Sequence, residues 1–234
     1  MHPQTDIVIP VHNALEYVRD CLDSVFTKTK NFRFILVDDF SDLETTKHLH
    51  RVLGHQPTAL YIRTGQQKWF TRASNLGLRL VRTSRCVLLN SDCVVDEGWL
   101  DELYDVWAEA ESVIVGKRIG LVGSHQSMEE PRRWGEYAEP GYVTGHCLLL
   151  SIPIISEIAD RRGNSGWYLD EVHREALHIN SDRFLSYELN RAGYATVASF
   201  KAAVGHHGGK SWGHDLGRIA GVQIGDPQKG EIFG

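Results

Sequence analysis

Long hydrophobic runs are missing from this sequence. No stretch of about 18 apolar residues occurs, so no transmembrane helix is predicted. Residues 1–6 are polar and lead directly into the first apolar run without the charged and apolar segments of a signal peptide, so none is expected. Long basic runs are also lacking, and the net charge is −5. Nucleic acid is therefore not expected as a main partner, because binding a phosphate backbone needs clustered positive charge.

Cysteine is scarce as well. The chain has four, Cys21, Cys86, Cys93 and Cys147, and no two of them form a CxxC pair. A chain of 234 residues can bury a sizeable core without disulfide bonds. The cysteines are therefore predicted to be reduced, as in a cytoplasmic protein. Any contact with a membrane is expected to be peripheral or to involve partner proteins.

The first half of the chain is built from alternating apolar and amphipathic segments. Strands are predicted at 6–11, 33–37, 59–62 and 86–89, and helices at 14–26, 42–53, 71–81 and 97–110. Four alternations predict an α/β fold with a mostly parallel central sheet flanked by helices. Asn13 and Asp42 precede two of the helices and are expected to act as helix caps or turn residues.

The second half is less regular. Strands are predicted at 119–124, 141–151 and 195–204, and helices at 154–161 and 181–192, the last one ending at Gly193. The sequence shows neither an internal repeat nor a linker, so residues 1–212 are predicted to form one domain. Residues 213–234 are rich in glycine and lack periodicity, and a mobile tail is expected there.

Polar residues follow three of the predicted strands, in the segments 10–13, 38–39 and 90–92. In open α/β sheets, ligands bind beyond the carboxyl ends of the strands. Each segment alone is also compatible with a helix cap or a turn. Three such segments together would be costly to bury without a cation or hydrogen-bond donors. Carboxylate and amide oxygens favour Mg²⁺ or Mn²⁺.

Four motifs in this order resemble the GT-A domain of family-2 glycosyltransferases: VIPVHNA, VDDFSD, SNLGL and LLNSDCVVDEGWL. They correspond to the family's P-x-x-N, DD-x-S, N-x-G and DxD elements, the last often written NSD. Later segments are similar to family elements too: 144–150 to the strand before the acceptor region, 167–171 to F-D-E, 180–194 to E-D-x-D-L…R-x-A-G-Y, and 204–211 to H-x-G-G-x-S. The resemblance covers roughly residues 5–213.

The resemblance implies a Rossmann-like GT-A domain with a nucleotide-binding half, 1–110, and an acceptor-binding half, 111–212. It implies an inverting transferase that uses a divalent metal, Mn²⁺ or Mg²⁺. The donor would be a nucleoside-diphosphate sugar, with UDP as the expected nucleotide. The acceptor would be a hydroxyl of a glycan or a lipid-linked saccharide, as in polysaccharide biosynthesis.

The resemblance also assigns site residues. Those expected at the nucleotide are Pro10, His12, Asn13, Asp38, Asp39, Arg72, Asn75 and Ser91. Either of the two adjacent aspartates could accept hydrogen bonds from the nucleoside, while the other closes a turn. Asn90 and Asp92 would point to the same side of an extended segment and face the diphosphate and metal.

His206 is implied as a further ligand of the metal or the diphosphate. Taken without the resemblance, the pair His206–His207 would be interpreted as surface or core histidines. Lys210 and Arg218 could add positive charge near the phosphates, and a solvated loop accounts for them equally well.

Asp182 is the candidate general base, which an inverting transfer needs next to the acceptor hydroxyl. A helix cap formed by Ser181 and Asp182 is the alternative. His146 is expected to line the donor sugar pocket. Trp167 and Tyr168 are expected to bind donor or acceptor, or to be buried in the core.

Two departures from the family pattern put the acceptor type in doubt: Ser181 replaces a common Glu, and Phe184 replaces a common Asp. They leave open a non-catalytic relative that binds a nucleotide or glycan. A sugar-phosphate nucleotidyltransferase is disfavoured, because strand one leads into HNALEY rather than a Gly-rich basic loop.

Overall fold

The computed structural model describes residues 2–125, 133–134, 137–138, 143–163, 168–169 and 181–208. The helices are α1 Leu15–Lys28, α2 Leu43–Gly54, α3 Trp69–Leu78, α4 Trp99–Val113, α5 Ile152–Arg161 and α6 Ser181–Arg191. The strands are β1 Thr5–Val11, β2 Phe32–Asp38, β3 Leu60–Arg63, β4 Arg85–Leu89, β5 Cys93–Val95, β6 Ile119–Ser124, β7 Arg133–Trp134, β8 Tyr137–Ala138, β9 Cys147–Ser151, β10 Ala195–Ser199 and β11 Val204–His206.

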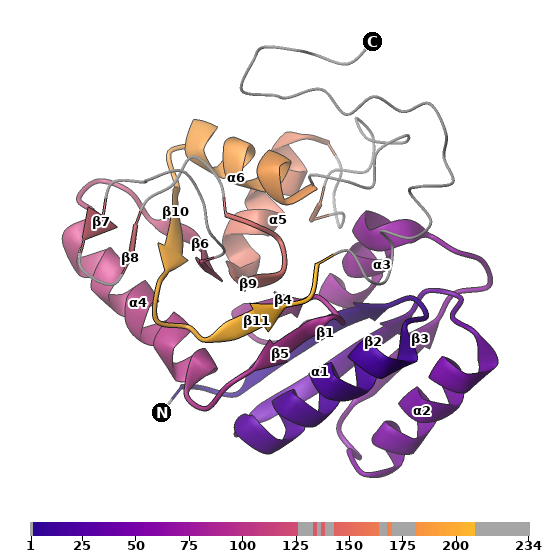
Figure 1. Ribbon diagram of the computed structural model, residues 1–234. Helices are drawn as coiled ribbons and strands as arrows, with labels where there is room; N and C mark the ends of the chain where they lie inside the picture. Colours follow the sequence, from indigo (N-terminus) through magenta and orange to yellow (C-terminus); the bar gives the residue numbers. More distant parts are fainter. Residues whose placement is uncertain are drawn as a thin grey trace.

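A nine-stranded sheet runs through the described part of the chain in the order β3-β2-β1-β4-β9-β6-β10-β8-β7 (Figure 1). Strands β3, β2, β1 and β4 are mutually parallel, and β10 is parallel to β6. Strand β9 lies antiparallel between β4 and β6. The predicted α/β architecture is confirmed, and this reversed strand joins its two parallel parts.

Helices cover both faces of this sheet, and each face has its own apolar cluster. Alternate residues of β1 divide between them: Ile7, Ile9 and Val11 pack with α1, α2 and α4, and Val8 packs with α3, α5 and α6. This alternation follows from the two-residue period of a strand. Strands buried on both faces explain why the predicted runs are apolar throughout.

Helix α3 lies close to the sheet because of Gly77, in the SNLGL motif. A Cβ atom at this position would overlap the Val8 side chain. The close approach brings the first turn of α3 to the carboxyl ends of β1 and β2, where polar residues were predicted.

The last predicted strand, 195–204, is two strands in the structure. Strand β10 ends at Ser199, and β11 leaves the large sheet to pair antiparallel with β5 (Figure 1). Strand β5 was not predicted at all. The strand predicted at 141–151 was also too long, because within its described part residues 143–146 precede β9 without strand structure.

Asn13 does not cap α1, contrary to expectation. Ala14 is the residue before the helix, in a left-handed conformation and without a side-chain cap. The Asn13 Oδ1 atom instead accepts a hydrogen bond from Asp42 N (2.7 Å). Asp42 does cap α2, as expected, and accepts from Thr45 N (2.8 Å).

The remaining predicted helices and strands occur with ends displaced by a few residues. Across the described residues, no helix combines the length and the apolar character needed to span a bilayer. The predicted tail, 213–234, lies outside the described residues.

Candidate active site

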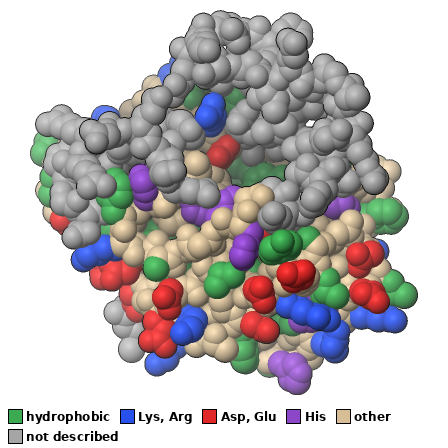
Figure 2. Space-filling view, viewed as in Figure 1, with side chains coloured by type: hydrophobic (Ala, Val, Ile, Leu, Met, Phe, Trp, Pro, Cys, Tyr) green, Lys and Arg blue, Asp and Glu red, His purple; other side chains and the backbone are tan. Residues whose placement is uncertain are grey.

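The carboxyl end of β4 carries the NSD motif, and β11 brings His206 to it. His206 is the register partner of Cys93, the first residue of β5. As a result, the His206 Nε2 atom lies 3.2 Å from Asp92 Oδ1 and 3.4 Å from Asn90 Nδ2. Asn90, Asp92 and His206, which the resemblance implies as metal ligands, therefore meet at one place. Figure 2 shows histidine side chains on this face of the molecule, beside residues that are not described.

The chemistry of this cluster suits a divalent cation. Asn90 Oδ1 is buried, and none of the described residues donates a hydrogen bond to it. Leaving a buried carbonyl oxygen without a partner is costly, whereas a cation would satisfy it. Together with the Asp92 carboxylate and the His206 imidazole, it forms a donor set that accepts Mn²⁺ or Mg²⁺.

Cys93 lies close to this cluster, but its side chain is not suited to bind the metal. One potential ligand atom from each of Asp92, Cys93 and His206 falls within 4.8 Å of the others. The Cys93 thiol, however, donates to the His146 carbonyl (3.3 Å), and burial raises its pKa well above the usual value. A protonated thiol is a poor metal ligand, since the thiolate is the coordinating form.

His146 lies in the turn before β9 and is buried beside the metal cluster. Its ring stacks on His206 with centroids 5.0 Å apart and an interplanar angle of 15°. Its two ring nitrogens contact the hydroxyls of Ser124 and Thr144. Burial is the main cause, and the nearby His206 the second, of a lowering of the His146 pKa to about 4. The ring is therefore neutral at physiological pH. These contacts place it against His206; lining of a sugar pocket stays a prediction.

Asp182, at the start of α6, approaches the same turn. Its Oδ2 atom accepts a hydrogen bond from Gly145 N (2.7 Å). Burial raises the pKa of Asp182, and hydrogen bonds from backbone N–H groups, the first from Gly145, oppose this rise. A carboxylate with a raised pKa is a stronger proton acceptor than an exposed one, which suits a general base.

A second polar group lies at the carboxyl ends of β1 and β2. The His12 Nδ1 atom bonds to Asp39 O (2.8 Å), which makes Nδ1 the protonated nitrogen, and Nε2 lies 3.2 Å from the amide nitrogens of Asn13 and Gln67. Pro10 is buried within β1 beside this group. The arrangement brings together Pro10, His12 and Asn13 with the two aspartates, as predicted for a nucleotide site.

Asp38 and Asp39 are both fully buried and have different protein partners. Asp38 accepts from Ser41 N (2.8 Å), Thr46 Oγ1 (3.0 Å) and Tyr61 Oη (2.8 Å), and it forms an ion pair with Arg63. Burial alone would raise its pKa, but the hydrogen bonds outweigh burial and lower it.

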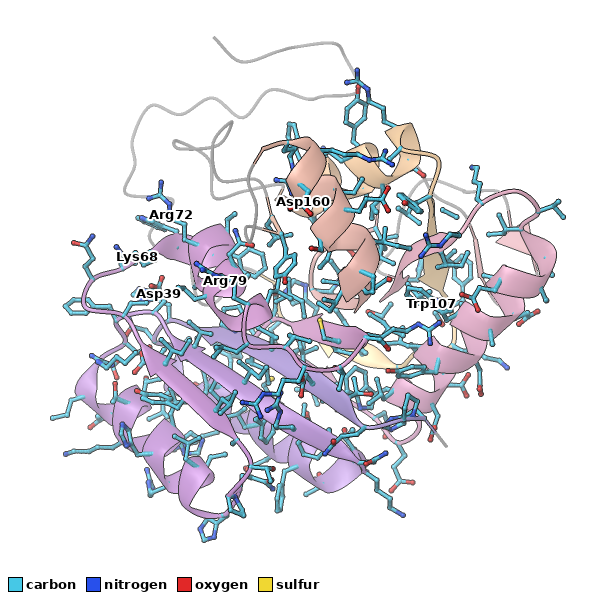
Figure 3. All side chains as sticks on the ribbon, turned by 180° about the vertical axis from the view of Figure 1, so that it is seen from behind. Asp39, Lys68, Arg72, Arg79, Trp107 and Asp160 are labelled. Carbon is cyan, nitrogen blue, oxygen red and sulfur yellow. The ribbon has the colours of Figure 1, made fainter. Side chains whose placement is uncertain are left out.

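Asp39 instead serves the start of α3. It accepts from Lys68 N (2.7 Å), Trp69 N (2.8 Å) and Thr64 Oγ1 (3.1 Å), and burial raises its pKa. Lys68 and Arg72 lie near Asp39 at this end of α3 (Figure 3). The nucleoside contacts of both aspartates stay predictions, and these bonds show that each carboxylate also organises the surrounding backbone.

Residues with strained backbone conformations cluster around the carboxyl ends of β1 and β2. Of the five non-glycine residues with positive φ in the described ranges, four surround these strand ends: Asn13 (53°), Ala14 (56°), Phe40 (60°) and Trp69 (67°). Left-handed conformations of such residues cost energy and are concentrated at ligand sites. This clustering supports a binding site at the ends of β1 and β2.

Three other predicted site residues, Asn75, Ser91 and Tyr168, are buried or half-buried. The amide of buried Asn75 pairs with the backbone of Leu169 through two hydrogen bonds, of 2.8 and 2.9 Å, rather than pointing into the polar group. Ser91 is buried between Asn90 and Asp92, and Tyr168 is half-buried against the second apolar cluster. Trp167, Lys210 and Arg218 lie outside the described residues.

The strand ends of a parallel sheet, a donor set suited to a cation and the partly buried Asp182 carboxylate together suit transfer of a group from a phosphorylated donor. Comparison with known proteins names the family. The sequence model described as "Glycosyl transferase family 2" matches residues 6–157. The chain belongs to glycosyl transferase family 2. The predicted resemblance to this family is thereby confirmed.

Two curated relatives of this family-2 chain show how far the likeness extends. The putative polypeptide N-acetylgalactosaminyltransferase 9 of Drosophila melanogaster is 30% identical over 132 residues, which is 54% of this chain and 20% of the relative. The glycosyltransferase GlyG of Streptococcus pneumoniae serotype 4 is 22% identical over 157 residues, which is 67% of this chain and 49% of the relative. The chain thus spans between a fifth and a half of these proteins.

Two solved structures share the fold. The mannosyltransferase PcManGT from Pyrobaculum calidifontis, in complex with GDP-Man and Mn²⁺, aligns with a TM-score of 0.61 at 16% identity, covering 98% of this chain and 68% of its own. S. aureus TarS in complex with UDP-GlcNAc aligns with a TM-score of 0.63 at 11% identity, covering 86% and 57%. At these identities the likeness confirms the GT-A fold.

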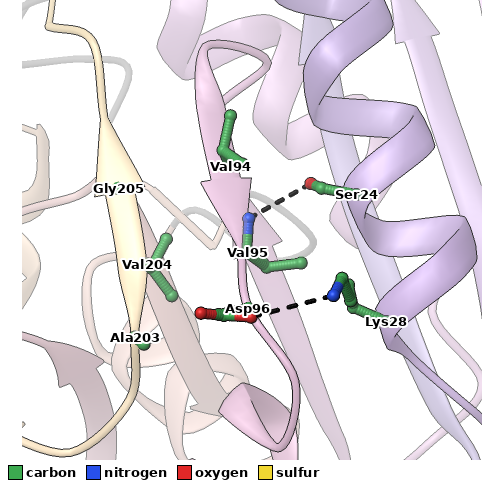
Figure 4. Close-up of a pocket in the computed structure, with 8 residues that line it drawn as sticks. All are labelled: Ser24, Lys28, Val94, Val95, Asp96, Ala203, Val204 and Gly205. Atoms are coloured by element: carbon green, nitrogen blue, oxygen red, sulfur yellow. Dashed lines mark hydrogen bonds and ion pairs between the residues drawn. The ribbon is translucent and has the colours of Figure 1, made fainter.

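A pocket in the described part of this family-2 chain is lined by none of the predicted site residues (Figure 4). It is lined by α1, β5 and β11, where Ser24 Oγ accepts from Val95 N (3.1 Å) and Lys28 lies 3.9 Å from Asp96. The pocket therefore lies against the β5–β11 pair, of which His206 is the last residue.

Sequence reasoning missed the residues that support the site. They are Ser124, Thr144 and Gly145 around His146 and Asp182, Tyr61, Arg63 and Thr64 around the two aspartates, and Gln67 beside His12. A signal existed only for Gly145, which interrupts a predicted strand between two polar residues. The others have side chains common on any surface.

Proposed function

We propose that this family-2 chain is a metal-dependent, inverting glycosyltransferase. It moves a sugar from a nucleoside-diphosphate sugar, with UDP as the expected nucleotide, to a hydroxyl of a glycan or a lipid-linked saccharide. The observation that carries the proposal is the meeting of Asn90, Asp92 and His206, in which the buried Asn90 Oδ1 atom has no hydrogen-bond donor among the described residues. The two solved structures hold GDP-Man with Mn²⁺ and UDP-GlcNAc, which supports the proposal.

In this proposal Asp92, His206 and Asn90 hold Mn²⁺ or Mg²⁺, and the ion supplies Lewis-acid stabilisation of the diphosphate leaving group. The group formed by His12, Asn13, Asp39 and the first turn of α3 binds the nucleoside. Arg72 lies in this turn, where it can face the phosphates.

Asp182 acts on the acceptor. Its carboxylate takes the proton of the acceptor hydroxyl while that oxygen forms a bond with the anomeric carbon. The bond between the anomeric carbon and the diphosphate oxygen breaks, and the nucleoside diphosphate leaves. The raised pKa caused by burial of Asp182 supports this role.

The four cysteines are all free and buried, which agrees with the proposed cytoplasmic location.

Release of nucleoside diphosphate from UDP-glucose, UDP-GlcNAc and GDP-mannose, with and without Mn²⁺, tests the proposal. We expect one donor to be consumed in the presence of metal, and Asp92→Asn to lower that rate at least about 100-fold through loss of charge stabilisation. The matched control is Asp96→Asn, because the Asp96 side chain is 73% exposed and pairs only loosely with Lys28.

Retained nucleotide binding without turnover of any donor would instead support the non-catalytic relative. Equal rates in Asp92→Asn and Asp96→Asn would contradict the metal site.

A further inference from the structure

Gly145 and His146 occupy the turn before β9, between the candidate base and the candidate metal cluster. On one side, Gly145 N donates to Asp182 Oδ2 at 2.7 Å. The approach is possible because residue 145 has no side chain: a Cβ atom there would lie 2.9 Å from Asp182 Cβ and 3.2 Å from Asp182 Oδ2. The first contact is shorter than side-chain packing tolerates, and the second is tighter than ordinary van der Waals contact.

On the other side, the same turn holds the NSD segment. The His146 carbonyl accepts from Asn90 N (2.8 Å) and from the Cys93 thiol (3.3 Å). Asn90, which follows β4, and Cys93, which begins β5, lie on either side of Asp92 along the chain. A shift of the His146 peptide would therefore move Asn90 and Asp92.

The ring of His146 holds the third member of the cluster. It is 2% exposed, lies nearly parallel to the His206 ring, and is fixed by hydroxyls on both sides, Ser124 from β6 and Thr144 from the turn. A hydroxyl can donate or accept, so both contacts persist in either tautomer of the neutral ring. His206 thus rests on a ring that cannot rotate freely.

We propose that His146 is a positioning residue that couples the metal cluster to the candidate base. It aligns His206 by stacking, aligns Asn90 through its carbonyl, and fixes the peptide whose neighbouring N–H holds Asp182. This inference rests on the proposed function, since it concerns the metal that Asn90, Asp92 and His206 would bind. Residues that orient metal ligands typically change metal affinity by about 10- to 100-fold when removed.

Titration of purified protein with Mn²⁺, alone and in the presence of UDP, tests the proposal, with free Mn²⁺ followed by electron paramagnetic resonance. We expect His146→Ala to weaken Mn²⁺ binding by about 10-fold or more. We expect His146→Phe to lie between His146→Ala and the wild type, because phenylalanine keeps a flat ring against His206 but loses the bonds to Ser124 and Thr144.

The matched control is His2→Ala. His2 is also a buried histidine, 8% exposed, and it stacks on Tyr104 at 5.6 Å and 13°, but it belongs to the N-terminal end of the sheet. Its removal should lower the melting temperature without changing Mn²⁺ affinity. A merely structural role of His146 would give the same pattern as His2→Ala.

The outcomes separate the two proposals. Unchanged Mn²⁺ affinity in His146→Ala, with normal binding by the wild type, overturns the positioning role and leaves the proposed function intact. Failure of the wild type to bind Mn²⁺ in both titrations, with UDP and without it, overturns the metal-dependent function and with it the coupling. If His146→Ala does not fold, Ser124→Ala and Thr144→Val serve instead. Each keeps the His146 ring but removes one of the hydroxyls that hold it, and unchanged Mn²⁺ affinity in both variants overturns the proposal.

Discussion

The Nε2 atom of His206 lies 3.2 Å from the Asp92 carboxylate, although most of the second half of the chain separates the two residues. The contact exists because β11 pairs with β5 immediately after the NSD motif. Two three-residue strands thus determine whether the candidate metal cluster forms. The supporting contacts continue through His146 and Gly145 to Asp182, so the candidate base and the candidate ligands share one set of hydrogen bonds.

Replacing the candidate base should separate catalysis from stability. We expect Asp182→Asn to lower kcat by about 10²- to 10⁴-fold, the usual contribution of a general base. Its amide oxygen can still accept from Gly145 N, so nucleotide and Mn²⁺ affinities should stay within about twofold of the wild type. Steady-state kinetics and titration calorimetry measure these quantities.

The same variant should not be less stable at neutral pH. Burial raises the pKa of Asp182 in the folded protein, so the stability contributed by this group falls as pH rises from the unfolded to the folded pKa. Removing the charge removes that cost. Asp105→Asn, on the exposed side of α4, controls for a general effect of charge. A large loss of stability together with full activity would show that Asp182 is a helix cap and no base.

The activity should also depend on pH in a defined direction. A general base must be deprotonated, so kcat/KM should fall as pH decreases through the raised pKa of Asp182, above the usual aspartate range. A profile of kcat/KM against pH measures this acid limb. Persistence of the limb in Asp182→Asn would assign it to another group.

Asp38 should prove to be a determinant of stability. Its carboxylate binds Ser41, Thr46, Tyr61 and Arg63, and these bonds lower its pKa. Stability from this group is present above the unfolded pKa and is lost as pH falls through the folded pKa. We expect Asp38→Asn to reduce the free energy of unfolding by about 1.5–3 kcal/mol, as for hydrogen bonds to a charged group.

Urea denaturation at pH 7 and at a pH below the usual aspartate pKa checks this prediction for Asp38. The difference between variant and wild type should shrink at the lower pH, because the Asp38 carboxyl is then protonated in the unfolded chain and approaches its lowered pKa in the folded protein. A difference that grows on acidification would contradict the assignment.

Asn75 was expected to contact the nucleotide, but its hydrogen bonds to Leu169 predict a role in stability instead. Its amide pairs with both backbone groups of Leu169, and burial makes unsatisfied partners costly. We expect Asn75→Ala to lower the free energy of unfolding by about 2–4 kcal/mol, counting about 1–2 kcal/mol for each of the two groups left unpaired. Nucleotide affinity, measured by calorimetry below the melting temperature, should change less than twofold. A tenfold loss of affinity in a stable variant would restore the nucleotide contact.

The sequence was sufficient to predict the α/β fold and the family, because strands buried on both faces and ordered motifs leave a strong signal. Asn90, Asp92 and His206 were predicted through the resemblance, yet the strand pair that unites them was missed. Strands as short as Cys93–Val95 and Val204–His206 show too few alternations to be recognised.

The partners of the two aspartates could not be predicted for a different reason. Asp38 binds residues of β3 and α2, and Asp39 binds the first turn of α3, so their contacts depend on how distant segments pack. Asn13 illustrates the same limit. Its type favours a helix cap, but the neighbouring Asp42 backbone offered a competing donor, and tertiary structure decided between them.

The central claim is that a nucleoside diphosphate and a divalent metal bind together at the ends of the strands. A thermal-shift screen of UDP, dTDP, GDP, ADP and CMP, each with and without Mn²⁺, tests it most directly. Selective binding stabilises the folded state by about 2.7 kcal/mol when the ligand is at a hundredfold excess over Kd. We predict a rise in melting temperature for one diphosphate that requires Mn²⁺ and is lost in Asp92→Asn. No rise with any nucleotide, or a rise that is independent of both Mn²⁺ and Asp92, would contradict the account.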